Sequence, residues 1–386
     1  MAAGERVFGL DLLRAMAILV VVYGHGLHFA SPDLPMDLLA LPILDGVTLF
    51  FVLSGFLIGR ILLKTINHEQ FNGSMLLQFW IRRWFRTLPN YYFVLTLIIL
   101  ATLLTGDQAP PMPENIASYY LFSQNLAWPH PEFFGEAWSL AIEEWFYLTI
   151  PLPLLLVSMT RKIDLHRFMW FYIFAVIIGT MMLRFFLVSL HGYDNKHDWD
   201  YGLKMLVVTR MDSLMFGVLG AYLSLYNKDL WARASHPLIF WSGVGLLFFD
   251  RYMRLGADNM AYLNYFSLTI TPIATLLLLP KLSTWHTMPG PVGKAVTFIS
   301  VNSYSMYLIN QALVAETLIP ALMPGLMHLL WRFGDHIHLI QFILFWLFTL
   351  AGSAFLYRFY EKPMTHLRDR FGKGHRTPAH AFKHPT

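Results

Sequence analysis

An arginine and a histidine lie eleven residues apart in an apolar segment near the start of the chain, GLDLLRAMAILVVVYGHG at 9–26. A helix has about 3.6 residues per turn, so Arg14 and His25 share one face and stand about 16 Å apart along the axis. A neutral imidazole can accept a proton from a hydroxyl, as a general base does. Asp11 can pair with Arg14. The alternative is an arginine that reaches the membrane surface and a histidine that bonds another helix.

A pair of acids interrupts a second apolar segment, EAWSLAIEEWFYL at 136–148. Glu143 and Glu144 point to different faces of a helix, so at least one faces the protein interior rather than lipid. An interior carboxylate can orient His25, as carboxylates do in acyl-transfer sites, and a structural salt bridge is the alternative. Ser139 lies one turn before Glu143 and is a candidate supporting residue.

Three arginines, Arg82, Arg83 and Arg86, enclose two aromatic residues just before TLP at 87–89. A guanidinium binds phosphate through two parallel hydrogen bonds. The cluster therefore indicates a site for a phosphate-rich ligand, in a cytoplasmic loop beside a membrane helix. The alternative is an ordinary basic flank that contacts anionic lipid.

Two further apolar segments contain small or charged residues. In GVTLFFVLSGFLIGR at 46–60, Ser54 and Gly55 permit close approach of another helix, and plain packing is the simplest interpretation. In TRMDSLMFG at 209–217, Arg210 and Asp212 enter a predicted membrane span. They either pair with other helices or serve the site, and the sequence leaves both possibilities open.

Membrane helices must position all these residues. Of 386 residues, 56% are hydrophobic and 13% charged, whereas soluble domains carry about a quarter charged residues. A mean hydropathy of +0.48 excludes a single water-soluble core. Windows of about 20 apolar residues, the length that crosses a bilayer, predict an all-α polytopic transmembrane bundle of about ten helices. The predicted spans lie near 10–30, 39–63, 88–105, 136–158, 167–190, 205–226, 236–250, 262–280, 296–323 and 338–360.

Basic residues gather in alternate connections, which predicts that both termini are cytoplasmic. Residues 1–365 are predicted to form the transmembrane domain and residues 366–386 a disordered basic cytoplasmic tail. The Pro-rich connection at 106–135, with its own aromatic residues, is predicted to lie at the membrane interface. The basic connections hold Arg60, Lys64, Arg82, Arg83, Arg86, Arg161, Lys162, Arg167, Lys228, Arg233, Lys281, Lys294 and the residues of the tail, whereas the others hold only Lys196, Lys204, Arg251, Arg254 and Arg332.

Composition also excludes several kinds of chemistry. The chain has no cysteine, which rules out disulfides, cysteine zinc sites and an acyl-cysteine intermediate. The net charge of +4 is too small to indicate nucleic-acid binding. The histidine-rich end, GKGHRTPAHAFKHPT, has no metal-ligand spacing, so neither a metal nor a bound cofactor is predicted.

Taken together and in order, these motifs resemble acyltransferase family 3, a family of multi-span membrane acyltransferases. The resemblance covers nearly the whole chain. It includes Arg14 with His25, FFVLSGFLI at 50–58, Arg83 and Arg86 followed by TLP, WSLAIEEWFYL at 138–148, RMDSLMFGVLGAYL at 210–223, NSYSMYLINQ at 302–311 and YRFYEKP at 357–363.

The resemblance implies transfer of an acyl group, usually acetyl, from cytoplasmic acyl-CoA to a hydroxyl of an extracytoplasmic or lipid-linked glycan. Acyl-CoA would be a co-substrate, and the glycan and the lipid of the inner membrane would be the other partners. By position, the resemblance implies a base at His25, a donor-positioning group at Arg14, CoA phosphate ligands at Arg83 and Arg86, and the family's acidic pair at Glu143 and Glu144.

The chain departs from the family pattern in three respects. Asn310 stands where many members have a histidine, which puts the role of that position in doubt, although Tyr304 of the same motif stays a supporting candidate. Thr48 stands where an aspartate is common, with Asp45 three residues earlier. Many relatives also carry an SGNH hydrolase-like domain after the last helix, and we expect this chain to be the stand-alone form.

A secondary transporter is the main alternative function, because transporters also bury charges at mid-membrane. Many transporters are built from internal repeats. The sequence shows no repeat that relates its first five predicted helices to its last five. We therefore favour the acyltransferase.

Overall fold

A computed structural model of the chain describes residues 6–31, 34–40, 42, 44–68, 71–105, 111–160, 163–255, 259–329 and 336–371. Over these ranges the regular elements are helices and there is no strand, which confirms the predicted all-α class. Residues 372–386 of the predicted tail lie outside the described residues. Helix α18 (Lys362–Phe371) runs through the predicted domain boundary at residue 365.

Eight helical stretches within the described chain are long and apolar enough to cross a membrane. Two more helices occupy the sixth and seventh predicted spans. Helix α10 (Met211–Tyr226) has 16 residues and reaches about 24 Å, against about 30 Å for a bilayer core, and α12 (Pro237–Leu255) is not among the eight. The total of ten spans and the cytoplasmic termini therefore stay predictions. The eight stretches are Phe8–Phe29, Gly46–Ile66, Gly73–Leu104, Ala137–Thr160, Leu165–His191, Met260–Ser283, Pro291–Gly325 and Ile337–Leu367.

The remaining elements have the following bounds. The α-helices are α1 (Phe8–Gly26), α2 (Met36–Ala40), α3 (Gly46–His68), α4 (Gly73–Thr105), α5 (Ala117–Tyr120), α6 (Ala137–Thr149), α7 (Pro151–Thr160), α8 (Leu165–His191), α9 (Lys196–Trp199), α11 (Lys228–Ala234), α13 (Met260–Tyr262), α14 (Leu268–Ser283), α15 (Pro291–Ile309), α16 (Ile319–Leu329) and α17 (Ile337–Leu356). The 3₁₀ turn η1 (Leu27–Phe29) and the π-helical segments η3 (Asp200–Lys204), η4 (Leu263–Ser267), η5 (Asn310–Leu318) and η7 (Tyr357–Glu361) join some of them.

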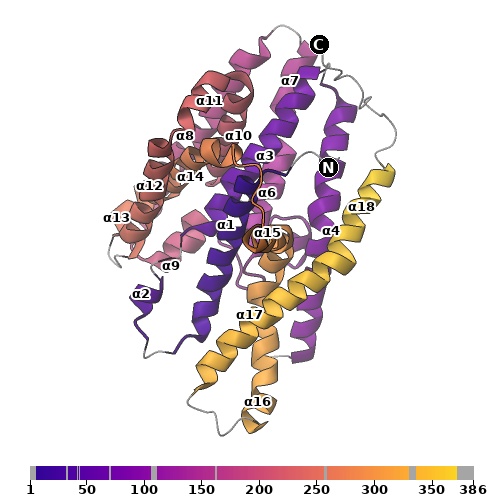
Figure 1. Cartoon of the computed structure of the whole chain (residues 1–386), viewed down its shortest axis with the longest axis vertical. Coiled ribbons are helices and arrows are strands. Elements are labelled where there is room, and N and C mark those ends of the chain that lie inside the picture. The colour runs from indigo at the N-terminus through magenta and orange to yellow at the C-terminus, as the bar shows by residue number, and fades with distance from the viewer. Residues whose placement is uncertain are drawn as a thin grey trace.

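Helices α1 and α3 lie at the centre of the bundle (Figure 1). Helix α1 packs on α3, α14 and α15, and α3 packs on α10. Helices α8, α10, α12 and α14 form one flank, while α4, α15, α17 and α18 form the other. Helix α1, which carries Arg14 and His25, therefore contacts both flanks.

Glycine allows α3 and α10 to touch backbone to backbone. A Cβ added at Gly55 would lie 1.9 Å from the Leu214 carbonyl oxygen, and one added at Gly217 would lie 2.1 Å from the Val52 carbonyl oxygen. Small residues at such a crossing let membrane helices approach closely. The packing interpretation of Ser54-Gly55 thus has a direct structural basis in Gly55.

The basic cluster at 82–86 belongs to a helix, so the prediction of a loop was wrong. Helix α4 runs unbroken from Gly73 to Thr105 with Pro89 inside it. Two side-chain hydrogen bonds hold the turn before this proline: the Thr87 hydroxyl donates to the Arg83 carbonyl at 3.2 Å, and Tyr304 of α15 donates to the Thr87 carbonyl at 2.9 Å.

The connection before α6 is tied into the protein interior. Asn125 is fully buried, and its side-chain amide donates to the carbonyls of Trp138 at 3.0 Å and Met205 at 2.6 Å. The backbone N–H of Val207 donates to the Asn125 carbonyl at 2.9 Å. This connection and the segment before α10 therefore support each other's non-helical backbone, which membrane proteins allow only where protein covers it.

We predict that Gly55→Ala lowers the free energy of unfolding by about 1–3 kcal/mol, because the new methyl group must push α3 away from α10. Thermal unfolding of the purified protein, followed by size-exclusion chromatography after heating, measures the effect. Gly179→Ala on α8 is the matched control, since a Cβ there meets nothing within 4 Å. An unchanged unfolding temperature for Gly55→Ala would contradict the close contact.

Candidate functional site

Two hollows inside the bundle are lined by several of the predicted site residues. The larger, which we call the His25 cavity, measures about 710 Å³. The smaller, which we call the Arg14 pocket, measures about 120 Å³. Val47 and Tyr307 line both hollows. The Arg14 pocket is also lined by Ser54, Arg83, Arg86, Thr87, Ser139, Glu143, Tyr147 and Tyr304.

His25 is half-buried at the end of α1 and lines the larger cavity. Its Nδ1 lies 2.5 Å from Oδ1 of Asn310, which is buried on η5. The Asn310 amide nitrogen donates to the carbonyls of Met306 at 3.0 Å and Tyr307 at 2.8 Å. Because carbonyls only accept, this geometry assigns the amide orientation and makes Oδ1 the acceptor for His25. Nδ1 therefore carries the proton, and Nε2 keeps the lone pair that a general base needs.

A second histidine in the cavity wall is a poor base. His130 lies in the connection before α6, and burial lowers the pKa of its imidazole to about 3. A group with so low a pKa is a weak base, and near neutral pH it accepts a proton from a hydroxyl only poorly. Of the two described histidines in this wall, His25 is the one whose surroundings suit proton transfer.

No carboxylate stands beside His25 in the described contacts, contrary to the expected orienting role of Glu143 or Glu144. The amide of Asn310 occupies that place instead. Helix α6 turns Trp138 toward the His25 cavity and Glu143 toward the Arg14 pocket. Five residues span about 7.5 Å along a helix, which carries the acids past the wall between the two hollows.

The predicted pairing of Arg14 with Asp11 is present. Asp11 lies 3.5 Å from Arg14 and 3.0 Å from Arg6, and it accepts a hydrogen bond from Ser300 of α15 at 2.7 Å. Asp11 is buried, with 6% of its surface exposed. The acid therefore anchors Arg14 at the base of the pocket and joins α1 to α15.

The Arg14 pocket has an excess of positive charge. Its lining includes the guanidiniums of Arg14, Arg83 and Arg86 and a single carboxylate, that of Glu143. Glu143 accepts from the Tyr147 hydroxyl at 2.9 Å. Three cations around one acid suit an anionic ligand that binds through guanidinium forks.

The hydroxyl-bearing candidates hold the walls of the Arg14 pocket together. Ser54 lies 2.5 Å from the Tyr147 hydroxyl, and Ser139 lies 2.6 Å from the Tyr307 hydroxyl. Glu144 lines neither hollow and accepts from the Thr87 hydroxyl at 2.7 Å.

Tyr147 and Tyr307 were missed in the sequence, although helical spacing points to both. Tyr147 follows Glu143 by four residues, and Tyr307 stands midway between Tyr304 and Asn310 at intervals of three, so each shares a helix face with a predicted residue.

Comparison with known proteins identifies the family. The model of acyltransferase family 3, described as an acyltransferase domain, matches residues 7–358. The chain belongs to this family. The resemblance found in its motifs is therefore confirmed, and the family together with eight apolar helices supports a multi-pass membrane protein.

Relatives in this family carry O-acetyltransferase names. A Staphylococcus aureus (strain COL) protein provisionally named an O-acetyltransferase is 29% identical over 332 residues, which cover 80% of this chain and 50% of that protein. O-acetyltransferase OatA of Staphylococcus aureus (strain NCTC 8325) is 25% identical over 382 residues, or 92% of this chain and 57% of OatA. The chain thus spans about half the length of these relatives. No solved structure matched. The family match supports an acyltransferase.

Arg210 and Asp212, the charged pair of the family motif in α10, join structural networks. Asp212 lies 2.7 Å from Arg184 of α8, and both side chains are almost fully buried. Arg210 donates to the Thr48 hydroxyl at 2.5 Å, and Asp45 accepts from that hydroxyl at 2.8 Å. Many family members have an aspartate in place of Thr48. Here Asp45, three residues earlier, places its carboxylate beside Thr48 instead.

The described residues contain no cluster of three or more His, Asp or Glu side chains arranged to hold a metal ion.

We predict that Arg184→Met destabilises the protein by about 3–5 kcal/mol, because it leaves the buried Asp212 charge without its closest partner. The apparent unfolding temperature in detergent measures this. Arg167→Met on the same helix is the matched control, since Arg167 pairs with Asp164 at the surface, where the two side chains are 90% and 54% exposed. Equal stability of the two variants would contradict a structural role for the Arg184–Asp212 pair.

Proposed function

We propose that this protein is a cell-membrane O-acyltransferase that moves an acyl group, acetyl in the simplest case, from cytoplasmic acyl-CoA to a hydroxyl of an extracytoplasmic or lipid-linked glycan. The observation that carries this proposal is that a histidine whose Nδ1 faces the Asn310 oxygen lines one hollow while three arginines line the next. The two hollows share a wall. A donor with phosphates and an acceptor with hydroxyls can thus meet at that wall.

The donor would bind through the Arg14 pocket. Arg83 and Arg86, three residues apart on α4, face the same side of the helix and would hold CoA phosphates. Arg14 would guide the acyl chain along α1. The axial separation of Arg14 and His25, about 16 Å, is the distance that the pantetheine arm would bridge.

The acceptor would bind in the His25 cavity with its hydroxyl at Nε2. His25 would take the hydroxyl proton while the oxygen attacks the thioester carbonyl. The tetrahedral intermediate would then collapse, the carbon–sulfur bond would break, and the CoA thiolate would recover the proton from the imidazolium. Asn310 keeps the imidazole in the productive tautomer throughout, in the way that an orienting partner does in acyl-transfer triads. Direct transfer of this kind needs no acylated residue.

Glu143 would organise the donor side and not His25. Its carboxylate accepts from Tyr147 and interacts electrostatically with Arg86 and Arg83. A carboxylate so placed keeps the guanidiniums in position between turnovers, when no phosphate is bound. Glu144 would act indirectly, because it accepts a hydrogen bond from Thr87, which lines the pocket.

We predict that His25→Ala lowers kcat for acyl transfer by about 10²–10⁴-fold, the usual contribution of a general base. Purified protein in detergent, labelled acetyl-CoA and envelope glycans from the source cells provide the assay, with CoA release and glycan labelling as readouts. The matched control is His28→Ala, since His28 is exposed and lines neither hollow.

Asn310→Leu, which removes the orienting acceptor, should give an intermediate loss in the same assay. Wild-type rates in membrane-inserted His25→Ala would remove His25 from the mechanism. Solute uptake into proteoliposomes without any acyl transfer would favour the transporter alternative.

We predict that Arg86→Gln raises KM for acetyl-CoA by at least about ten-fold with a smaller effect on kcat, because a charge-assisted hydrogen bond to phosphate contributes about 1.5–3 kcal/mol. Arg82→Gln is the control from the same cluster, since Arg82 is exposed and lines neither hollow. The same KM for both variants would place the donor phosphates elsewhere.

A further inference from the structure

We infer that the His25 cavity selects an anionic saccharide, one whose carboxylate or phosphate lies apart from the hydroxyl that is acylated. This inference rests on the proposed function, because it assigns the cavity to the acceptor. It is carried by the distribution of charge over the cavity walls.

One wall of the cavity holds four cations, of which two have acid partners. Lys204 lies 2.7 Å from Asp200, and Arg254 lies 3.3 Å from Asp45 and 2.7 Å from Asp250. Trp199 also lies beneath both cations, with its ring centre 5.8 Å from Lys204 and 6.0 Å from Arg254. Cation–π contacts of this kind hold the two side chains in place.

The other two cations of this wall, Lys196 and Arg251, form no ion pair with any acid of the described chain. Arg251 donates to the Ala40 carbonyl at 2.6 Å, and its Nε is buried without a hydrogen-bond partner among the described residues. Lys196 is an exposed side chain that lines the same cavity. Two cations without an ion pair, one of them with a buried and unpartnered Nε, favour an anionic ligand at this wall.

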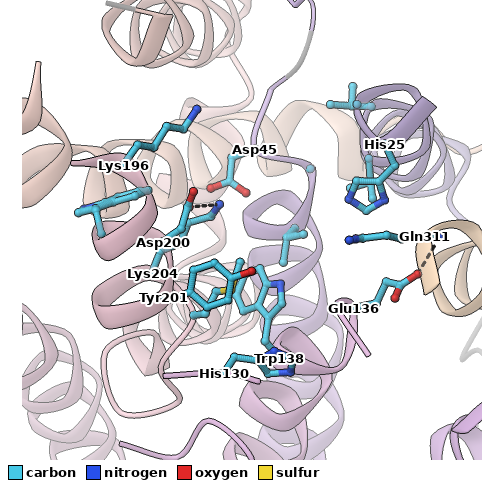
Figure 2. Close-up of a pocket in the computed structure, with 18 of the residues that line it drawn as sticks. His25, Asp45, His130, Glu136, Trp138, Lys196, Asp200, Tyr201, Lys204 and Gln311 are labelled. Carbon is cyan, nitrogen blue, oxygen red and sulfur yellow. Dashed lines mark hydrogen bonds and ion pairs between the residues drawn. The ribbon is translucent and has the colours of Figure 1, made fainter. Parts of the chain in front are cut away.

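The wall that contains His25 is acidic (Figure 2). In this view His25, Gln311 and Glu136 lie on one side of the cavity, and Lys196 and Lys204 lie on the other. Glu316, which accepts from the Gln311 side-chain amide at 2.8 Å, also lines the cavity. This wall therefore offers carboxyl groups, which form hydrogen bonds with hydroxyls.

Glu136 has one oxygen left over for a ligand. Its Oε1 accepts from the backbone N–H of Gln311 at 2.8 Å and Ala312 at 3.1 Å. Its Oε2 is buried and has no hydrogen-bond partner in the part of the chain that the structure describes. A buried polar oxygen without a partner is destabilising. A saccharide hydroxyl bound beside His25 would form the missing hydrogen bond.

The two walls together impose one orientation on a ligand. An anionic group is attracted to Lys196 and Arg251, across the cavity from His25. A hydroxyl of the same molecule then faces His25 and Glu136. A neutral saccharide is not held in one preferred orientation, so the charge of the acceptor would decide whether it binds with its hydroxyl at His25.

Binding of a matched pair of ligands tests this inference. Trigalacturonate and its methyl ester share every ring hydroxyl and differ only in their carboxylate charge, so they serve as probes. Calorimetry on the full-length protein in nanodiscs should show at least a ten-fold tighter Kd for trigalacturonate, because hydrogen bonds to charged groups exceed that factor. The ratio of the two Kd values should fall toward one in the double variant Lys196→Gln/Arg251→Gln.

The double variant Lys228→Gln/Arg233→Gln is the charge-matched control, since both residues are exposed on α11 and line neither hollow. It should keep the preference. Equal Kd values for the two probes, no binding of trigalacturonate, or a preference that survives in Lys196→Gln/Arg251→Gln would each overturn the inference.

The two proposals fail in different ways. His25→Ala should still prefer trigalacturonate, because the cation wall is intact. A preference for trigalacturonate in a protein that transfers no acyl group would refute the proposed function and leave the anion-selective cavity standing. Equal rates of transfer to matched neutral and anionic acceptors would leave the enzyme standing and refute the selectivity.

Discussion

The side-chain amide of Asn310 donates both of its hydrogens to the carbonyls of Met306 and Tyr307. Its oxygen is therefore the atom that accepts a hydrogen bond from the His25 imidazole on α1. The backbone around it is π-helical, and the N–H groups of Gln311 and Ala312 donate to the Glu136 carboxylate. A π-helical segment of this kind commonly marks a functional site. The tautomer of His25 thus depends on three elements that are distant in sequence: α1, η5 and the residue before α6. Any change that restores regular helical geometry at η5 would move Asn310. The N–H at Nδ1 of His25 would then lose its acceptor.

Charges inside the bundle fall into two groups that differ in their partners. Arg184 and Asp212 pair closely away from either hollow. By contrast, Lys196 and Arg251 face a hollow and have no acid partner within the described residues. A membrane protein cannot leave a charge unpaired in contact with lipid without a large penalty. It can leave one unpaired where a ligand or water reaches it, so the unpaired cations mark the places where ligands are expected.

The sequence was sufficient for the helical class, for most of the spans and for the family, because all three depend on local patterns. The Arg14–Asp11 pair was predictable too, since both residues lie on one helix. The partner of His25 was not predictable, because Asn310 is 285 residues away and an amide is not an obvious substitute for a carboxylate. The loop expected at 82–86 was an error of a different kind. The apolar pattern placed the start of the span near residue 88, whereas α4 begins at Gly73 and continues through Pro89.

Tyr307 lies where the two halves of the proposed reaction must meet. Its hydroxyl lies 2.6 Å from Ser139 and 3.3 Å from the Glu136 carbonyl, and its side chain lines both hollows. A closed wall protects a thioester on the donor side from water that enters the acceptor cavity. Each neutral hydrogen bond contributes only about 0.5–1.5 kcal/mol, so a bound donor can displace the ring at modest cost. Because Glu136 contacts both Tyr307 and η5, the ring that lines both hollows and the amide that orients His25 share a common support.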